Sequence, residues 1–559
     1  MVERHVANVN VVGSSPITRF DRMCRILVAD KIAEAGLERL RAAHGATFDV
    51  RQGLPSTELA AIIGEYDGML IRSAVQITKE VLANPGRLTA IARAGTGVDN
   101  VDLDAATAAG VLVLNTPDAN TISTAEHTFA MLLALHRRIP DAHRHVKEGQ
   151  WKRSAFEGAQ VAGKTLGIVG LGRIGRAVAQ RALAFEMKVI AHDPFVSGGS
   201  ALDGAVSMVR SLRELLQQAD CVTLHANLTE DSRHMIGSAE LASMKQGARL
   251  INCARGALVD EAALADALNR GHVAGAAIDV FENEPPAGSP LLTAKNIVLT
   301  PHLAASTEEA QVRVSVEAAD MLLAYLLRGE IHSAVNLAGV PSRLPPRSLA
   351  ALDLCSRMGT ILSAWCAEGV ERIRVTVQSE SWGELADTLG WQALVAVVSP
   401  HLSGRLNLVN AREQAERRGI VVEHSAHSAG RNQPETILII AESRGQAHDI
   451  EGTISPDGKP RILSIDGYRM ELIPERSVVL IFNDDRPGVI GLVGQAFGNA
   501  GINIADMALS RRGQTALMVL KLDEPMPADL RDALRAMNPP IHSLRTVSLP
   551  PVRETHPES

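Results

Sequence analysis

Three glycines within residues 163–194 constrain the fold of this chain more than any other feature. Gly170, Gly172 and Gly175 form the pattern G-x-G-x-x-G between an apolar run, TLGIV, and a helical pattern, RIGRAVAQRALAF. The first glycine allows a tight turn, the second lets a pyrophosphate approach the backbone, and the third lets helix and strand pack closely. Asp193 closes the next apolar run, where its carboxylate can bond ribose hydroxyls and repel a 2′-phosphate. The segment therefore predicts a dinucleotide site that prefers NAD to NADP.

Apolar runs alternate with helical patterns through the first 330 or so residues. Runs such as RILVAD, LTAIARAG, ADCVTLHA and NIVLTPH are apolar on successive residues, as strands buried on both faces are. The alternation predicts parallel sheets covered by helices. One long helix is expected over 121–139, capped by Ser123 or Thr124, and another over 315–329. We therefore predict an α/β protein with two Rossmann-like, doubly wound domains.

The pattern changes near residue 335. The segment NLAGVPSRLPPRS, 336–348, is rich in proline and reads as a linker. The next stretch, to about 475, holds strand-like pieces without a catalytic constellation, and indicates an α+β domain. The last 80 or so residues follow the order strand, helix, strand, strand, helix, strand, which is the ferredoxin-like βαββαβ unit.

Composition excludes several classes of function. A chain of 559 residues is too long for one core. A net charge of -7 and an aromatic content of 3% argue against nucleic-acid binding. Five cysteines without a CxxC pair favour a reducing cytoplasm over a disulfide framework or a zinc site. No apolar run approaches the roughly 20 residues of a membrane helix. Residues 1–22 lack the apolar core of a signal peptide and are expected to be a disordered extension.

Polar side chains follow three of the predicted strands of the second series. Arg255 follows INCA, Asp279, Glu282 and Glu284 follow AAI, and His302 follows VLTP. Ligands of open parallel sheets bind beyond the carboxyl ends of the strands. The arginine can hold a carboxylate, the histidine can carry a hydroxyl proton, and an acidic group can keep the imidazole charged. This arrangement favours hydride transfer, although Arg255 read alone could be a surface arginine.

These motifs together resemble the D-2-hydroxyacid dehydrogenase family. The resemblance rests on GLGRIG, HDP, NCARGALVDE, AAIDVFENEPP and TPHLAAST. The segments IRSAVQIT and ARAGTGVDNVD, with the C-terminal part, resemble the long form of that family, which adds an intervening domain and an ACT domain. The similarity covers about residues 24 to 549. It implies that Arg255, Glu284 and His302 are the catalytic set.

The resemblance implies NAD as the cofactor and no metal. It carries cofactor contacts over to Thr96, Gly170, Gly172, Arg173, Ile174, Gly175, Asp193, Ala226, Cys253, Ala254, Arg255, Asp279, His302 and Ala305.

The family also implies a divided first domain joined to the second by a hinge. The expected parts are an extension (1–22), a substrate-binding domain (23–117 and 307–335), an NAD-binding domain (118–306), an intervening domain (336–475), an ACT domain (476–550) and a tail (551–559).

The long form oxidises 3-phospho-D-glycerate to 3-phosphohydroxypyruvate, the first step of L-serine synthesis, and the resemblance implies this activity. Reduction of 2-oxoglutarate is an expected side activity. Arg72, Ser73 and Arg93 follow strands of the first domain and are expected to bind the substrate phosphate; the two arginines could also be ordinary surface residues. Two alternatives stay open: a family member acting on glyoxylate, hydroxypyruvate or D-lactate, and a non-catalytic NAD-sensing binding protein.

Similarity to serine-binding ACT domains implies L-serine as an effector held between the paired tails of a homo-oligomer, a dimer or a tetramer. Asp485, with a free carboxylate, is expected to take the ammonium group. Asn503 of a partner subunit would take the carboxylate or hydroxyl. In the alternative interpretation Asp485 only orders its turn and the tail only dimerises. Residues 336–475 would hold an allosteric anion or substrate site, or serve as a spacer.

Overall fold

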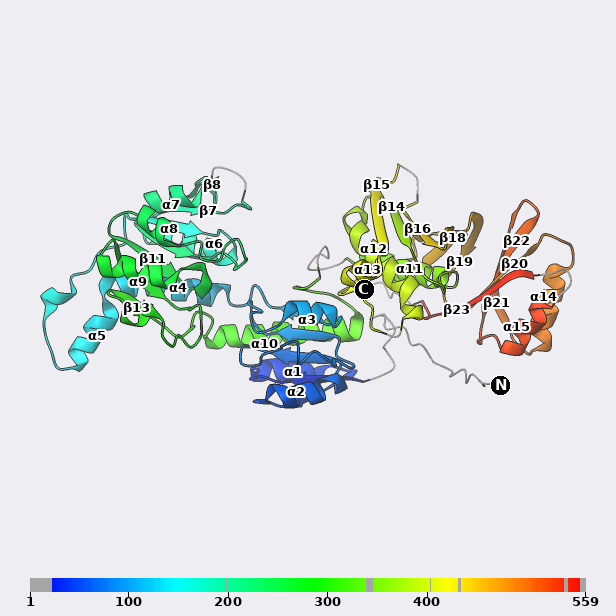
Figure 1. Cartoon of the computed structure of the whole chain (residues 1–559), viewed down its shortest axis with the longest axis horizontal. Helices are drawn as coiled ribbons and strands as arrows, with labels where there is room; N and C mark the ends of the chain where they lie inside the picture. Colours follow the sequence, from blue (N-terminus) through cyan, green and yellow to red (C-terminus); the bar gives the residue numbers. More distant parts are fainter. Residues whose placement is uncertain are drawn as a thin grey trace.

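The computed structural model arranges the chain as a row of four domains (Figure 1). It describes residues 23–196, 200–337, 345–402, 404–430, 434–536 and 541–552, so the extension 1–22 and most of the predicted linker and tail lie outside the described residues. Within these ranges, no helix combines the length and the apolar character that crossing a bilayer requires.

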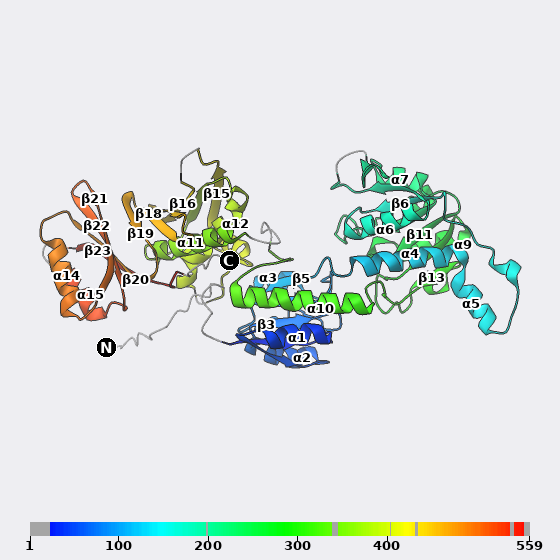
Figure 2. The ribbon, with the colours of Figure 1, turned by 180° about the vertical axis from the view of Figure 1, so that it is seen from behind.

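The first domain is a five-stranded parallel sheet. Its strands are β1 (Cys24–Val28), β2 (Ala46–Val50), β3 (Gly68–Ile71), β4 (Ala90–Arg93) and β5 (Leu112–Asn115), in the order β2-β1-β3-β4-β5. Helices α1 (Glu34–Ala42), α2 (Ser56–Ile62) and α3 (Leu103–Ala108) connect them. A distant helix, α10 (Glu308–Leu323), lies along α1 (Figures 1 and 2) and buries Val314, Ala318 and Leu322 in the core of this sheet. The chain therefore leaves this domain after β5 and returns to it.

The second domain is an eight-stranded sheet in the order β13-β12-β11-β10-β6-β7-β9-β8. The strand order reverses between β6 and β10, which is the position where such sheets bind nucleotides. Only the short β8 runs antiparallel to its neighbour. The strands are β6 (Thr165–Val169), β7 (Lys188–His192), β8 (Ser200–Ala201), β9 (Val206–Met208), β10 (Cys221–Leu224), β11 (Ala248–Asn252), β12 (Val273–Ile278) and β13 (Ile297–Leu299), and the helices are α4 (Thr121–Arg137), α5 (Ile139–Lys147), α6 (Arg173–Ala184), α7 (Leu212–Gln218), α8 (Ser238–Ser243) and α9 (Glu261–Arg270).

The two long helices expected from the sequence have different bounds in the structure. The helix expected over 121–139 is two helices, α4 and α5, because Arg138 between them has a left-handed φ of 52°. The predicted cap is also wrong: Ser123 lies inside the first turn and bonds the Thr307 hydroxyl at 2.7 Å. Thr307 in turn caps α10, which begins seven residues before the expected start and continues as a π-helical turn to Gly329.

The third domain has a six-stranded sheet in the order β15-β14-β16-β17-β18-β19. Helices α11 (Pro346–Ser363) and α12 (Ala386–Val398) pack against the sheet, and α13 (Ala411–Arg418) packs against α12. The strands are β14 (Arg372–Gln378), β15 (Val421–His427), β16 (Thr436–Ser443), β17 (Gln446–Ile454), β18 (Pro460–Ile465) and β19 (Tyr468–Leu472).

The fourth domain has the predicted ferredoxin-like order. It consists of β20 (Arg476–Asp484), α14 (Val489–Asn499), β21 (Ile504–Arg512), β22 (Thr515–Leu522), α15 (Ala528–Arg535) and β23 (Ile541–Leu549), with the antiparallel sheet order β21-β22-β20-β23. Its helices cover one face of the sheet. Val478, Leu480 and Val519 on the other face join the core of the third domain.

A buried arginine strengthens this connection. Arg357 of α11, only 3% exposed, donates to the carbonyls of Pro474, Pro550 and Pro551 at 2.6 to 3.2 Å and pairs with Asp353. A guanidinium buried with these acceptors is satisfied, and it fastens both ends of the fourth domain to α11. The third and fourth domains therefore form one packed unit.

Candidate active site

The glycine loop lies between β6 and α6, as its motif predicts. Gly170 has a φ of 91°, and a Cβ there would lie 2.7 Å from the carbonyl oxygen of His225, which follows β10. A Cβ at Gly175 would lie 2.2 Å from the Gly170 carbonyl oxygen. A Cβ at Gly172 would meet no atom within 4 Å, so this part of the loop is open at the start of α6. An open loop at a helix N-terminus suits a pyrophosphate, and the residues present therefore fit a dinucleotide.

Asp193 organises the loop from the end of β7. Its carboxylate accepts the backbone N–H groups of Leu171 at 2.8 Å and Phe195 at 2.9 Å. Lone pairs remain for ribose hydroxyls, because a carboxylate can accept about four hydrogen bonds. Arg173, in the first turn of α6, forms an ion pair with Asp118 in the segment that connects the two domains.

The remaining predicted cofactor positions are distributed over the first two domains. The Ala226 backbone nitrogen lies next to Gly170, and Ile174 packs on the core beneath the loop. Thr96 of the first domain donates to the Asn120 side chain at 2.8 Å. Burial raises the pKa of the Cys253 thiol to about 12, so this group stays protonated. The Ala305 carbonyl accepts a bond from Gln311.

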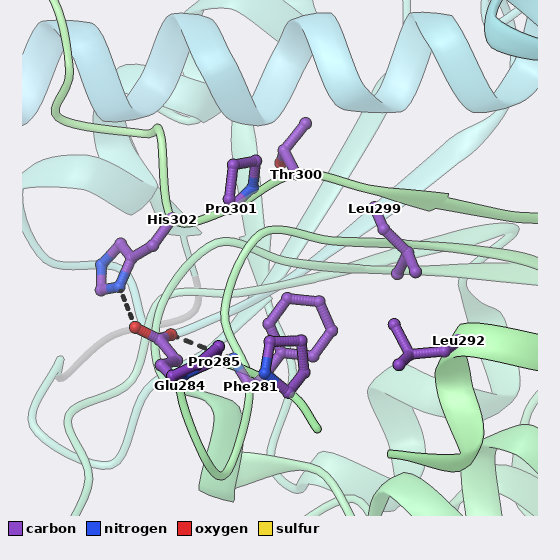
Figure 3. A pocket seen from close by; sticks show the side chains of 9 residues that line it. Phe281, Glu284, Pro285, Leu292, Leu299, Thr300, Pro301 and His302 are labelled. Carbon is purple, nitrogen blue, oxygen red and sulfur yellow. Dashed lines mark hydrogen bonds and ion pairs between the residues drawn. The ribbon is translucent and has the colours of Figure 1, made fainter. Parts of the chain in front are cut away.

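His302 and Glu284 form a hydrogen-bonded pair after β13 and β12 (Figure 3). The His302 Nδ1 atom lies 2.8 Å from the Glu284 carboxylate, and both side chains are half-exposed. The bond to Glu284 raises the pKa of the His302 imidazole, against the effect of partial burial. Burial alone would raise the pKa of the Glu284 carboxyl, but the bonds from His302 and the Phe281 amide outweigh it and lower that pKa. The pair therefore favours imidazolium and carboxylate.

An apolar cavity of about 380 Å³ lies beside this pair. Phe281, Pro285, Leu292 and Leu299 line it together with the pair itself (Figure 3). The low polarity of this wall strengthens the attraction between the two side chains.

Asp279 positions the loop that carries His302. Its carboxylate has no exposed surface and accepts the Leu303 and Ala304 amides, the Thr300 hydroxyl at 2.6 Å, and His127 at 3.2 Å. Burial alone would raise the pKa of Asp279, but these four donors lower it. The Asp279 carboxylate thus holds the loop by its backbone, and the contact of Asp279 with the cofactor stays a prediction.

One group of side chains has the composition of a metal site. Ligand atoms of His127, Cys253 and Asp279 lie within 4.8 Å of one another. The Asp279 oxygens already accept four hydrogen bonds, whereas a metal ligand needs free lone pairs. These side chains thus form a hydrogen-bonded cluster that supports the loop.

Arg255 reaches from the end of β11 across to the first domain. Its Nε lies 3.1 Å from Asp99, and its Nη1 donates to the Ala254 carbonyl at 2.7 Å. A Cβ at Gly97 would lie 2.1 Å from its Nη2, so the Arg255 guanidinium lies directly against this residue of the first domain. Arg255 is close enough to lower the pKa of His302 as well as that of Arg93. It therefore connects the two domains through an ion pair and is not an isolated surface residue.

Two arginines of the first domain lie close to Arg255 and form a cluster with it. Burial, reinforced by Arg255, lowers the pKa of Arg93 to about 10. The buried Nε of Arg93 has no hydrogen-bond partner among the described residues. Arg72 contributes to the same positive field, and Ser73 beside it is exposed. A buried donor without a partner costs free energy, so the cluster is suited to an anionic ligand.

Sequence reasoning missed the residues that hold the segment of Arg72. Asp30, 7% exposed, accepts the backbone amides of Arg72 and Ala74 at 3.1 and 3.0 Å. Asn100, also buried, donates to the carbonyls of Arg72 and Val75. Asp30 ends the first strand, and this strand-end position was the available signal.

The residues predicted to bind serine lie apart at opposite ends of α14. The Asp485 carboxylate is not free as expected: it lies 3.3 Å from Arg511 Nε. Asn503 donates to Asp523 at 2.6 Å. Asp485 and Asn503 therefore do not contact each other within one chain.

Family models match three consecutive parts of the chain. The NAD-binding domain of the D-isomer specific 2-hydroxyacid dehydrogenases matches residues 129–304, the D-3-phosphoglycerate dehydrogenase intervening domain matches 350–466, and the ACT domain matches 477–538. Together with the nucleotide loop and the strand-end side chains, the first match defines an NAD-dependent oxidoreductase of the 2-hydroxyacid dehydrogenase class.

Comparison with full-length relatives narrows the class. A D-3-phosphoglycerate dehydrogenase from Synechocystis sp. is 38% identical over 92% of this chain and 93% of its own length. The enzyme of the same name from Methanocaldococcus jannaschii is 39% identical over 94% of this chain and its own full length. The chain belongs to the D-3-phosphoglycerate dehydrogenase family.

Solved structures match the first two domains. A glyoxylate reductase from Paecilomyces thermophila has a TM-score of 0.52 at 33% identity, and covers 56% of this chain and 98% of its own. A formate dehydrogenase from Staphylococcus aureus in complex with NAD has a TM-score of 0.51 at 28% identity, over 57% of this chain and 99% of its own.

Removing the charge of Glu284 should change the pH dependence of a reaction that uses His302 as base. Because Glu284 raises the pKa of His302, the neutral imidazole forms only at higher pH. Glu284→Gln should move the acidic limb of the kcat/KM profile for oxidation to lower pH, by on the order of one unit. Glu282→Gln is the matched control, since Glu282 pairs with Arg233 and His234 instead. An unmoved limb in a folded Glu284→Gln protein would contradict the pairing.

Replacing Asp193 by asparagine tests charge repulsion at the ribose. The asparagine side chain would keep an acceptor for a loop amide while removing the negative charge. We expect Asp193→Asn to raise NADP+ use relative to NAD+ by about tenfold or more, because like charges in contact cost several kcal/mol. Asp203→Asn, at an exposed carboxylate beyond β7, should leave the ratio unchanged. Equal use of both cofactors by the unmodified protein would show that Asp193 does not set the preference.

Proposed function

We propose that this protein oxidises 3-phospho-D-glycerate to 3-phosphohydroxypyruvate with NAD+, the first step of L-serine synthesis. The observation that carries the proposal is the convergence of Arg72, Arg93 and Arg255 beside the His302–Glu284 pair. A substrate with a carboxylate and a phosphate matches three guanidinium groups better than a simple 2-hydroxy acid does. The relatives of the same family carry the name of this activity.

His302 is the proposed proton carrier. Its Nδ1 is bonded to Glu284, so Nε2 is the atom that can take the proton of the substrate hydroxyl. Oxidation needs the neutral imidazole, and the Glu284 carboxylate stabilises the imidazolium that forms. In the reverse direction the imidazolium returns the proton to the carbonyl oxygen. Reduction of 2-oxoglutarate would use the same groups and is a proposed side activity.

The other site residues hold the reactants. Arg255 would bind the substrate carboxylate in place of Asp99, and Arg72 with Arg93 would bind the phosphate, with Ser73 beside them. The glycine loop and Asp193 would hold the cofactor, whose nicotinamide accepts the hydride from C2. Because Arg255 and the first-domain arginines belong to different domains, a ligand between them would favour a closed cleft.

One substrate series tests this proposal against both alternatives. We expect NADH formation with 3-phospho-D-glycerate at a higher kcat/KM than with D-glycerate or D-lactate. Arg93→Ala should raise the KM for 3-phospho-D-glycerate by about tenfold or more, and the KM for D-glycerate much less, because a bond to a charged group is worth about 1.5–3 kcal/mol. Arg39→Ala, on α1, is the control.

Two outcomes would contradict the proposed oxidation of 3-phospho-D-glycerate. A preference for glyoxylate or hydroxypyruvate reduction would favour a different dehydrogenase, and NAD binding without turnover would favour a sensor. Equal effects of Arg93→Ala on both substrates would remove Arg93 from the phosphate site.

We further infer that the fourth domain binds L-serine as a feedback inhibitor. Asp485 would take the serine ammonium after releasing Arg511, and Asn503 of a partner subunit would take the carboxylate or hydroxyl. The two residues lie at opposite ends of α14, so only a second copy of the domain could bring them together.

Removal of the Asp485 charge should separate inhibition from catalysis. Asp485→Asn should abolish inhibition by millimolar L-serine and leave uninhibited turnover nearly unchanged, because the residue lies outside the active site. Asp529→Asn, at an exposed carboxylate on α15, should remain inhibited. Serine-insensitive unmodified protein, or an equally inhibited Asp485→Asn protein, would overturn this assignment.

We also propose a homo-oligomer that uses the arm around α5. This helix has no buried residue and projects from the second domain (Figure 1). Ile139, Val146 and Trp151 are 52%, 54% and 77% exposed, and a surface helix with this much apolar area is typical of an interface. Light scattering should give a multiple of the chain mass, and Val146→Asp should lower it; a monomeric unmodified protein would contradict the proposal.

A further inference from the structure

A second cavity lies where the third domain meets the first. It has a volume of about 260 Å³. Asn336 and Leu337, from the segment that leaves the first domain, form one wall, and Trp391 of α12 with Arg412 and Glu416 of α13 form the other. Its volume equals that of about nine water molecules at about 30 Å³ each. We call it the junction cavity.

Polar contacts fix the two domains to each other around this cavity. Arg405 donates to the carbonyls of Gly86 and Leu88, and Asn407 donates to the Gly110 carbonyl at 2.8 Å. Asn336 bonds the backbone of Val111 and Val113 at 2.9 Å. The junction cavity is therefore a built feature of a specific interface and not a gap between loosely placed parts.

The floor of the junction cavity is apolar. Leu337 and Val409 line it and also pack against the core of the first domain. The Trp391 ring lines it as well, with the Arg412 guanidinium 5.3 Å from the ring centroid. An apolar side chain of a ligand would be removed from water there.

The rim carries one cation and one unneutralised carboxylate. Arg412 is the only cation among the lining residues, and it lies 3.6 Å from Asp387. Glu413 pairs with Arg417. Among the described residues, the Glu416 carboxylate has no ion-pair or hydrogen-bond partner, although it stands one helical turn from Arg412. Excess negative charge disfavours an inorganic anion or a nucleotide and favours a ligand with an ammonium group.

We propose that the junction cavity binds an α-amino acid with an apolar side chain. Residues four apart on a helix have Cβ atoms about 5–6 Å apart, which lets Arg412 and Glu416 hold an α-carboxylate and an adjacent α-ammonium at the same time. The apolar side chain enters between Trp391, Leu337 and Val409. A leucine-sized ligand fits the volume.

The site is placed to affect catalysis at a distance. Arg405 holds the backbone just before β4, and Arg93 ends the same strand in the active-site cleft. A ligand in the junction cavity contacts both domains, so its binding free energy depends on how they are docked. Coupling of this kind changes the affinity of the active site for its substrate. This inference does not depend on which 2-hydroxy acid the enzyme oxidises.

Calorimetric binding to the full-length protein tests the proposal, with L-leucine as the probe. Glycine, isoamylamine and 4-methylpentanoate each lack one element of the ligand and should bind at least about tenfold more weakly. Glu416→Gln and Arg412→Gln should each weaken L-leucine binding by about tenfold or more. Arg418→Gln, at an exposed position on the same helix outside the cavity, should not.

Several binding results would contradict the proposed amino-acid site or part of it. Absence of L-leucine binding at tens of millimolar, or unchanged binding by Glu416→Gln, would overturn the site. Equal binding of glycine would overturn the apolar specificity. Loss of L-leucine binding in Asp485→Asn, with retention in Glu416→Gln, would place the probe on the fourth domain and overturn the proposal. Binding is measured without turnover, so these results are independent of the proposed reaction.

Discussion

The active-site geometry depends on one buried negative charge, the carboxylate of Asp279. A carboxylate without solvent contact is costly unless every lone pair is used, and here backbone amides, a hydroxyl and an imidazole supply the donors. Two of those donors are the amides of Leu303 and Ala304, directly after His302. Satisfying Asp279 therefore fixes the backbone of the loop, including the left-handed φ of 55° at His302. That conformation directs the imidazole toward Glu284 from the next strand.

The cleft then depends on how the chain crosses between the first two domains. The chain leaves the first domain after β5, forms the whole second domain, and returns through α10 to complete the first core. Two crossings let the domains move about a narrow connection while each keeps its own core. Arg255 and Asp99 form an ion pair between the two domains, and Arg173 pairs with Asp118 in the segment that connects them. A bound anion and a bound pyrophosphate would compete with these two carboxylates, so ligands would exchange interdomain ion pairs for their own contacts.

Much of this arrangement could be predicted from the sequence, because it rests on local rules. The glycine spacing, the successive apolar runs and the strand-end positions of Arg255, Glu284 and His302 each follow from a few neighbouring residues. Asp99 could not be predicted in the same way, since its partner Arg255 is separated from it by a long stretch of chain. The prediction of a free carboxylate at Asp485 was wrong for the same reason, because its partner Arg511 lies on another strand, β21.

The third domain was the hardest part to predict, and burial explains why. Helix α12, ADTLGWQALVAVV, is buried on nearly all sides, so its sequence lacks the alternation of apolar and polar faces that marks a surface helix. The neighbouring α11 is enclosed between the sheet and α12 in the same core. Hydrophobic periodicity indicates a helix only when one face of the helix is exposed to solvent.

The packing of the last two domains determines how a regulatory signal can travel. The sheet of the fourth domain shares its core with the third, and Arg357 fastens their connecting segments, so neither can move alone without exposing apolar surface. Their described contacts with the first domain run through the loop around Arg405 and Asn407. An effector bound to the fourth domain would therefore shift the unit as a whole against the start of β4. The junction cavity lies at that same contact, so a ligand there would act directly on the described contact between this unit and the first domain.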